Sequence, residues 1–319
     1  MLLFSAALVA GLILLILSSD KFIEHAALVA EKLNVSPIII GVTLVALGTS
    51  APEMVVSAIA ALDNAPGIAI GNVIGSNIAN IGLVFGATLL LAAIPISSSL
   101  AKKEVPLFLA ITILAGVLMF DGSLSVIDGV LLITAFLITL FILLRNSSEM
   151  EEELVSDLPE DDGSSITKSL IIAALGLAVL IGSSKLLVWG AIGIASALGV
   201  SDLVIGLTIV AIGTSLPELA ASITSVKKGH HDIAIGNVLG SNIFNLATVL
   251  PLPALLAPGM IESTIMSRDY WWMLGLSIVF AASIFLFAKQ NSISVPRWMA
   301  FPLLGAYTSY LYLLAVSGS

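Results

Sequence analysis

Residues 40–80 read IGVTLVALGTSAPEMVVSAIAALDNAPGIAIGNVIGSNIAN, and residues 205–245 read IGLTIVAIGTSLPELAASITSVKKGHHDIAIGNVLGSNIFN. The two stretches align without a gap at a constant offset of 165 and share 22 identities in 41 positions. An internal repeat of this kind indicates duplication of one structural unit. The identities gather around polar residues, which packing alone would not require. The repeat therefore predicts a shared site as well as a shared fold.

The composition is that of a membrane protein. Hydrophobic residues make up 58% of the chain, charged residues 10%, and the mean hydropathy is +1.13, far outside the range of soluble domains. Apolar stretches of about 17 residues or more can cross a bilayer as helices. Ten are predicted: 1–17, 37–62, 67–95, 104–120, 126–144, 168–189, 202–226, 232–257, 269–288 and 297–316. The first lacks a basic n-region and a cleavage site, so it is read as a retained helix.

The fold class predicted is an all-α polytopic membrane protein with ten transmembrane helices. Residues 1–145 form the first five-helix repeat and residues 168–319 the second; 146–167 is an acidic cytoplasmic linker. An odd number of spans per repeat inverts the second repeat relative to the first. Inverted repeats with interrupted helices are typical of secondary transporters, whose substrate site lies near the midplane.

The distribution of Lys and Arg predicts the orientation. Ten of the twelve lie in connections that follow odd-numbered spans: Lys21, Lys32, Lys102, Lys103, Arg145, Lys168, Lys227, Lys228, Lys289 and Arg297. Cytoplasmic connections carry such an excess. The odd-numbered connections are therefore predicted to be cytoplasmic, and the N and C termini to lie outside.

Two glutamates lie near the middle of apolar spans, Glu53 in the second and Glu218 in the seventh. A charged side chain at the bilayer centre costs about 2.5–3.5 kcal/mol on insertion scales, so a function is the default interpretation. Pro52 and Pro217 directly precede them and predict a break in each helix, because proline removes an amide donor. Carbonyl groups freed one turn earlier would line a cavity.

Oxygen donors accompany each glutamate at helical spacing. The candidate ligands, besides Glu53 and Glu218, are Ala46, Thr49, Ser50, Ser76 and Asn80 in the first repeat and Ala211, Thr214, Ser215, Ser241 and Asn245 in the second. Interhelical hydrogen bonding is the competing interpretation of the Ser and Asn residues, and close helix packing explains the neighbouring glycines. The donor set contains no Cys or His. Hard cations prefer such ligands, and calcium and sodium fit best.

The paired segments GTSxPE and GNxxGSN resemble the two alpha repeats of the calcium/cation antiporter family, the sodium/calcium exchangers. The resemblance covers nearly the whole chain and is closest in look to the bacterial inner-membrane calcium/sodium antiporters. It implies that Glu53 and Glu218 are the central calcium ligands, helped by Thr49 and Thr214, with sodium sharing these oxygens. One position departs: archaeal exchangers of this type carry an aspartate where Asn245 stands, which bears on ion stoichiometry and proton coupling.

The resemblance further implies the remaining ligand roles. Ala46 and Ala211 would contribute carbonyl oxygens, Asn80 a side-chain oxygen, and four serines their hydroxyls (Ser50, Ser76, Ser215 and Ser241). Transport would proceed by alternating access, with the first and sixth helices sliding across the other eight. The ions transported are Ca²⁺ and Na⁺, and no permanently bound cofactor is expected.

The sequence thus predicts a secondary active antiporter that exchanges sodium for calcium in a plasma membrane, a bacterial inner membrane by resemblance. Its partners are the two ions and the lipid bilayer; no nucleic acid and no obligate protein partner are expected. Two alternatives stay open: a proton-coupled calcium/cation antiporter, and a cation channel, because acidic rings also select cations. An enzyme is not expected, because the chain lacks a His-Glu-x-x-His motif and a serine elbow.

Overall fold

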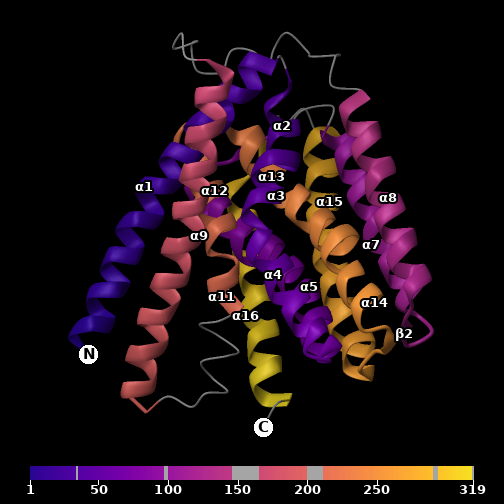
Figure 1. Cartoon of the computed structure of the whole chain (residues 1–319). Coiled ribbons are helices and arrows are strands. Elements are labelled where there is room, and N and C mark those ends of the chain that lie inside the picture. Colours follow the sequence, from indigo (N-terminus) through magenta and orange to yellow (C-terminus); the bar gives the residue numbers. More distant parts are fainter. Residues whose placement is uncertain (34, 97–99, 146–164, 200–210, 290–293, 318–319) are drawn as a thin grey trace.

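The computed structural model describes residues 1–33, 35–96, 100–145, 165–199, 211–289 and 294–317. Helices account for nearly all of the described chain (Figure 1). The first half contains α1 (Leu2–Leu33), α2 (Pro37–Ile40), η1 (Gly41–Val45), α3 (Ala46–Thr49), α4 (Ala51–Leu62), α5 (Pro66–Ala79), η2 (Asn80–Phe85), α6 (Gly86–Leu91), η3 (Leu100–Glu104), α7 (Val105–Met119) and α8 (Val126–Arg145). The segments η1, η2 and η3 are π-helical.

The second half repeats this order. It contains α9 (Ile166–Ala197), α11 (Ala211–Thr214), α12 (Leu216–Lys227), α13 (His231–Phe244), η6 (Asn245–Val249), α14 (Pro251–Leu256), η7 (Ile265–Asp269), α15 (Tyr270–Lys289), η8 (Arg297–Met299) and α16 (Ala300–Ser317). Here η6 and η7 are π-helical and η8 is a 3₁₀ turn.

Two short antiparallel strand pairs join the halves. β1 (Ile94–Pro95) pairs with β4 (Ser294–Val295), and β2 (Ser123–Leu124) pairs with β3 (Gly259–Met260). Each pair therefore ties a connection of one half to a connection of the other. Figure 1 also places both chain ends at the same end of the bundle as β2.

Within the described residues, seven helices are long and apolar enough to cross a membrane, or eight when one bent pair counts as a single span. The protein is therefore an all-helical polytopic membrane protein, apart from the strand pairs. Of the predicted spans, 104–120 corresponds to α7, which has 15 residues and follows a turn with three charged side chains. Residues 202–210 of the seventh span lie outside the described part of the chain, as do residues 146–164 of the acidic linker.

The first helix is longer than predicted. The apolar stretch ends at residue 17, but the helix α1 continues to Leu33. Its continuation is compatible with helix because Lys21 and Glu24 form an i,i+3 ion pair of 3.2 Å, and the following alanines, Ala26 and Ala27, are fully buried. At about 1.5 Å per residue, the 32 residues span about 48 Å, more than a bilayer core requires.

The predicted break at the first proline is present. Residues Pro37–Thr49 and Ala51–Leu62 form two helical segments that meet at 45°. The counterpart in the second half is interrupted at the corresponding residue, because α11 ends at Thr214 and α12 begins at Leu216. Each break places a new helix N-terminus, with its unpaired amide groups, inside the protein.

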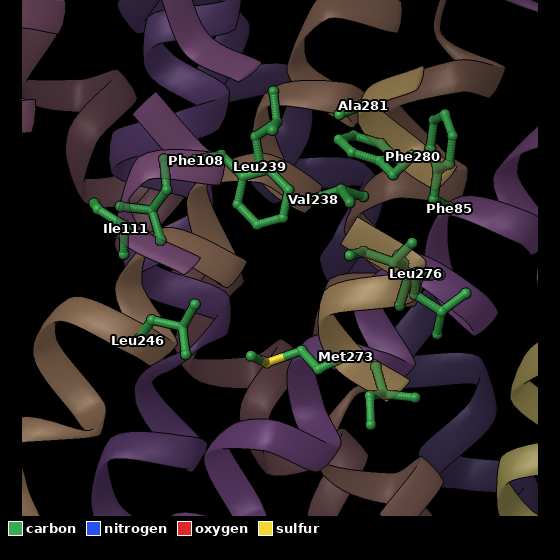
Figure 2. Close-up of a cluster of buried hydrophobic side chains, with 14 of the residues drawn as sticks. Phe85, Phe108, Ile111, Val238, Leu239, Leu246, Met273, Leu276, Phe280 and Ala281 are labelled. Atoms are coloured by element: carbon green, nitrogen blue, oxygen red, sulfur yellow. The ribbon is translucent and has the colours of Figure 1, made fainter. Parts of the chain in front are cut away.

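The core lies among the helices that surround these breaks. Figure 2 shows Phe85 of η2, Phe108 of α7 and Phe280 of α15 packed together with Leu239 of α13. Phe280 makes edge-to-face contacts with Phe85 at 4.8 Å and with Phe108 at 6.0 Å between ring centroids. Such contacts stabilise helix association, because in a bilayer packing replaces the hydrophobic effect between helices.

Small residues set the closest helix approach at the edge of the bundle. α1 and α9 run side by side there (Figure 1). A Cβ on Gly11 would lie 2.8 Å from the Leu187 amide nitrogen, and one on Gly190 would lie 2.7 Å from the Phe4 carbonyl oxygen. Glycine is therefore required for this backbone contact, as at small-residue interfaces in membranes generally.

Candidate ion-binding site

Glu53 and Glu218 occupy equivalent places in the first turn of a helix that begins at a break, Glu53 in α4 and Glu218 in α12. Both are only 1% exposed, and their carboxylates interact electrostatically with each other. A helix N-terminus favours negative charge, which partly offsets the burial. Two buried carboxylates of like charge are neutralised either by a bound cation or by protonation.

The site is assembled from both halves of the chain. Ser50 Oγ, in the first break, donates to Glu218 Oε1 at 3.3 Å. Thr49 Oγ1 lies 3.1 Å from Asn237 Oδ1 of α13, and Ser241 Oγ lies 3.5 Å from the same oxygen. These contacts join residues that are 168 and 188 positions apart in sequence. The structure thus brings the polar groups of the two repeats together.

Asn237 is at the centre of this network. Besides accepting from Thr49 and Ser241, its side-chain amide donates to the Glu218 carbonyl at 3.2 Å and to Ser222 Oγ at 2.9 Å. The side chain is fully buried. Asn237 therefore links the helix that carries Glu218 to the Thr49 hydroxyl of the first repeat.

The first repeat contains the equivalent arrangement. The Asn72 amide donates to the Glu53 carbonyl at 3.4 Å and to Ser57 Oγ at 3.0 Å. The candidate ligands chosen from sequence include neither asparagine. The signal was available, because both lie in the repeated block Gly-Asn-Val, four residues before the candidate serines Ser76 and Ser241.

The candidate asparagines Asn80 and Asn245 each stand at the first position of a π-helical segment, η2 and η6. π-helical turns in α-helices are frequent at functional sites. The segments cross over between the halves: α4, which carries Glu53, packs on η6, and α12, which carries Glu218, packs on η2. Each glutamate helix therefore faces the π-helical turn at the asparagine of the opposite repeat. In addition, Asn245 donates to Asn77 Oδ1 at 3.2 Å.

Several buried polar atoms in this region make no hydrogen bond to any described residue. They are Glu53 Oε2, Glu218 Oε2, Ser215 Oγ, both side-chain polar atoms of Asn80, and Asn245 Oδ1. Buried polar groups in native proteins are nearly always paired, and an unpaired one needs an explanation. A bound cation would provide a partner for carboxylate and amide oxygens of this kind. The set combines carboxylate, hydroxyl and amide groups. No group of three His, Cys, Asp or Glu occurs among the described residues.

The remaining candidate ligands lie in different environments. The Ala46 carbonyl accepts from the Ser50 amide at 3.0 Å and from Thr49 Oγ1 at 3.4 Å, so it is already engaged. Ser76 is 4% exposed and lines a cavity with Thr214. Ala211 begins α11. The carbonyl of Gly213, expected to be freed by the second proline, accepts from Ser184 Oγ of α9 at 3.0 Å.

Glycines let α13 pack closely against the first half. A Cβ on Gly240 of α13 would lie 2.4 Å from the Val42 carbonyl oxygen, and one on Gly236 would lie 2.7 Å from the Ile38 carbonyl oxygen. This face of α13 is therefore covered by α2 and η1. At the equivalent positions on α5, Gly71 and Gly75, no described residue comes within 4 Å of such a Cβ, and residues 202–210, the repeat counterpart of α2 and η1, lie outside the described part of the chain.

Comparison with known proteins agrees with this architecture. The family model described as "Sodium/calcium exchanger protein" matches residues 3–145 and 168–316. Inner membrane protein YrbG of Escherichia coli is 38% identical, over 98% of this chain and 97% of its own. Sodium/calcium exchanger MaX1 of Methanosarcina acetivorans is 31% identical, over 96% of this chain and 97% of its own.

A solved structure is similar over almost the whole length. The sodium-calcium exchanger NCX_Mj, soaked with 10 mM Na⁺ and without Ca²⁺, superposes with a TM-score of 0.84, at 37% identity, over 98% of both chains. The family match covers both repeats, and the fold match covers the breaks and the helices around them. The chain belongs to the sodium/calcium exchanger family.

Proposed function

We propose that this protein is a secondary active antiporter that exchanges Na⁺ for Ca²⁺ across a bacterial inner membrane. The observation that carries the proposal is the pair of buried carboxylates, Glu53 and Glu218, each of which retains an oxygen without a hydrogen-bond partner among the described residues. Two carboxylates balance one calcium ion, and the same oxygens suit sodium. The similarity to proteins named as sodium/calcium exchangers supports the choice of ions.

The ligand set proposed is the one predicted from sequence, together with Asn72 and Asn237 as residues that position it. Calcium tolerates irregular coordination by six to eight oxygens, which suits a mixture of carboxylate, hydroxyl and amide groups. The finer topology is part of the proposal: ten spans in two inverted five-helix repeats, with both termini outside. The positive-inside rule supports this orientation.

Alternating access is part of the proposal. The surface of α13 around Gly240 is covered by residues of η1 and α3, whereas no described residue comes within 4 Å of a Cβ built on Gly75 of α5. We propose that the two surfaces exchange these roles during transport, which would expose the site to one side at a time. Inverted repeats make such an exchange natural, because each half can adopt the other's packing.

The assignment is tested by calcium uptake into proteoliposomes. Vesicles loaded with sodium and diluted into sodium-free buffer with radiolabelled calcium should accumulate calcium, and collapse of the gradient with a sodium ionophore should stop it. Uptake that ignores the sodium gradient would overturn the proposal. Uptake driven by a pH gradient instead would assign proton coupling, and unitary currents in planar bilayers would assign a channel.

The glycine asymmetry gives a second test. Gly75→Ala should leave thermal stability in detergent unchanged or slightly raised, because the new methyl group meets no atom of the described residues and alanine favours helix by about 1 kcal/mol. It should slow transport, because the conformation that covers α5 then clashes. Gly240→Ala should instead destabilise the present conformation, by about 1–3 kcal/mol as overpacking usually does.

A conformational probe separates the two variants. The chain has no cysteine, so a single cysteine in place of Leu311, in the wall of the cavity beside α5, reports accessibility to a membrane-impermeant maleimide. Labelling should rise with Gly75→Ala and fall with Gly240→Ala. Equal labelling of both variants would contradict the exchange of surfaces.

A further inference from the structure

A cavity of about 240 Å³ lies against Gly71 and Gly75 of α5. One part of its wall consists of site residues, namely Asn72, Ser76 and Thr214. Another part consists of Asp269, Tyr307 and Tyr310. The cavity therefore joins the candidate ion site to the start of α15. That end of α15 follows β3, which pairs with β2 at the end of the bundle where both termini lie (Figure 1).

Asp269 is the only charged residue among the described residues that line the cavity. Its carboxylate forms a bidentate ion pair with the preceding residue. Arg268 Nε lies 2.7 Å from Asp269 Oδ1, and Arg268 Nη2 lies 3.2 Å from Asp269 Oδ2. Tyr310 Oη donates to Asp269 Oδ1 at 3.2 Å. Asp269 is 8% exposed as a residue, and the Arg268 side chain is 29% exposed. A fixed negative charge thus sits in the wall, balanced by a positive charge on its outer side.

The same pair of residue types occurs at the corresponding place in the first half. Lys103 and Glu104 precede Arg268 and Asp269 by the repeat offset of 165. Both pairs end a π-helical segment, η3 and η7, directly before α7 and α15. Glu104 is likewise buried, at 2% exposure. A base followed by a buried acid is therefore a feature of the duplicated unit.

We propose that the Arg268–Asp269 pair sets the electrostatic potential of this cavity, and thereby the preference of the transporter for calcium over sodium on that side. The inference rests on the proposed exchange of these two ions. A cavity with low-dielectric walls focuses the field of a nearby charge. The energy of an ion in that field is proportional to its charge. A change in potential that alters sodium binding by a given factor therefore alters calcium binding by the square of that factor.

Removing either partner should shift calcium binding in opposite directions. Asp269→Asn removes one negative charge from the cavity wall and keeps the guanidinium, so the half-saturating calcium concentration should rise at least threefold at low ionic strength. Arg268→Gln leaves the carboxylate unbalanced, so that concentration should fall by a similar factor. The corresponding sodium shifts should be about the square root of the calcium shifts. The double variant should return both values towards those of the wild type.

The measurement is the initial rate of sodium-driven uptake of radiolabelled calcium in proteoliposomes, with external calcium varied and then external sodium varied as a competitor on the same side. Repeating it with added choline chloride should shrink the shifts, since salt screens exposed charge. Glu262→Gln is the matched control: Glu262 is an exposed acid that contacts Gly67 at the start of α5 and is not among the residues that line the cavity. It should leave the calcium-to-sodium preference unchanged.

Three results would overturn the role of the pair. Shifts of the same sign in Asp269→Asn and Arg268→Gln would indicate a structural contact, as would equal factors for calcium and sodium. Unshifted values in both variants would also refute it. Absence of sodium-driven calcium uptake in the wild type would instead refute the proposed function, so the two failures are distinguishable.

Discussion

Replacing Glu53 by glutamine should lower sodium-driven calcium uptake at least 100-fold, and Glu218→Gln should do the same. Glutamine keeps the size of the side chain but removes one of the two charges that balance a calcium ion. At an effective dielectric constant of about 20, a unit charge 4 Å from another contributes about 4 kcal/mol, and a divalent ion doubles this. A loss of even 2.8 kcal/mol corresponds to about 100-fold in affinity.

Thermal stability in detergent provides the control for folding. The wild type should melt at a higher temperature when calcium is added, because a ligand that binds only the folded protein stabilises it. Each glutamine variant should remain folded without calcium, since it buries one charge fewer, and should lose the calcium-induced rise. Glu262→Gln, at an exposed position, should retain both uptake and the rise. A Glu53→Gln protein with more than a tenth of wild-type uptake would contradict the two-carboxylate site.

Asn237→Leu should abolish transport and lower the melting temperature, and Asn72→Leu should do so much less. Asn237 is fully buried and takes part in four side-chain hydrogen bonds, to Thr49, Ser241, Ser222 and the Glu218 carbonyl. Leucine leaves these groups without a partner, and each buried unsatisfied group costs about 1–3 kcal/mol. The expected loss is therefore several kcal/mol.

Asn72 is the matched control because it occupies the equivalent position of the first repeat. It is half-buried, lines the cavity, and makes two side-chain hydrogen bonds. Water in the cavity can replace those bonds at little cost. Melting curves and uptake of the two variants should be compared side by side. Equal effects, or a larger effect at Asn72, would show that Asn237 is not the structural centre of the site.

The two glutamates and the helix breaks beside them were predictable, because acids and prolines are unusual within apolar spans. Glu53 and Glu218 stand out as acids within apolar spans, and the adjoining prolines predict the helix break that the structure contains at 45°. The duplication was predictable because 22 identities survive in 41 positions. These signals are local, so no knowledge of tertiary contacts was needed to find them.

The role of Asn237 could not be predicted in the same way. An asparagine on a transmembrane helix has many possible partners, and one of its partners here is Thr49, which lies 188 residues away. The length of α1 was also missed, because hydropathy falls at Ser18 although the helix continues to Leu33.

The π-helical segments at Asn80 and Asn245 divide each span that carries one of these asparagines into two parts. Side chains before and after the segment face different directions around the helix axis. A π turn holds about one residue more than an α turn, so the helix beyond it is rotated by about 100° around its axis. Before the π segment, Ser76 lines the cavity that also contains Thr214. After it, Gly86 faces Leu304 of α16, whose Cγ would lie 3.0 Å from a Cβ on that glycine. Deleting one residue between 81 and 85 would keep the first alignment and lose the second. The single extra residue therefore lets one helix satisfy two surfaces that a regular helix could not face at once.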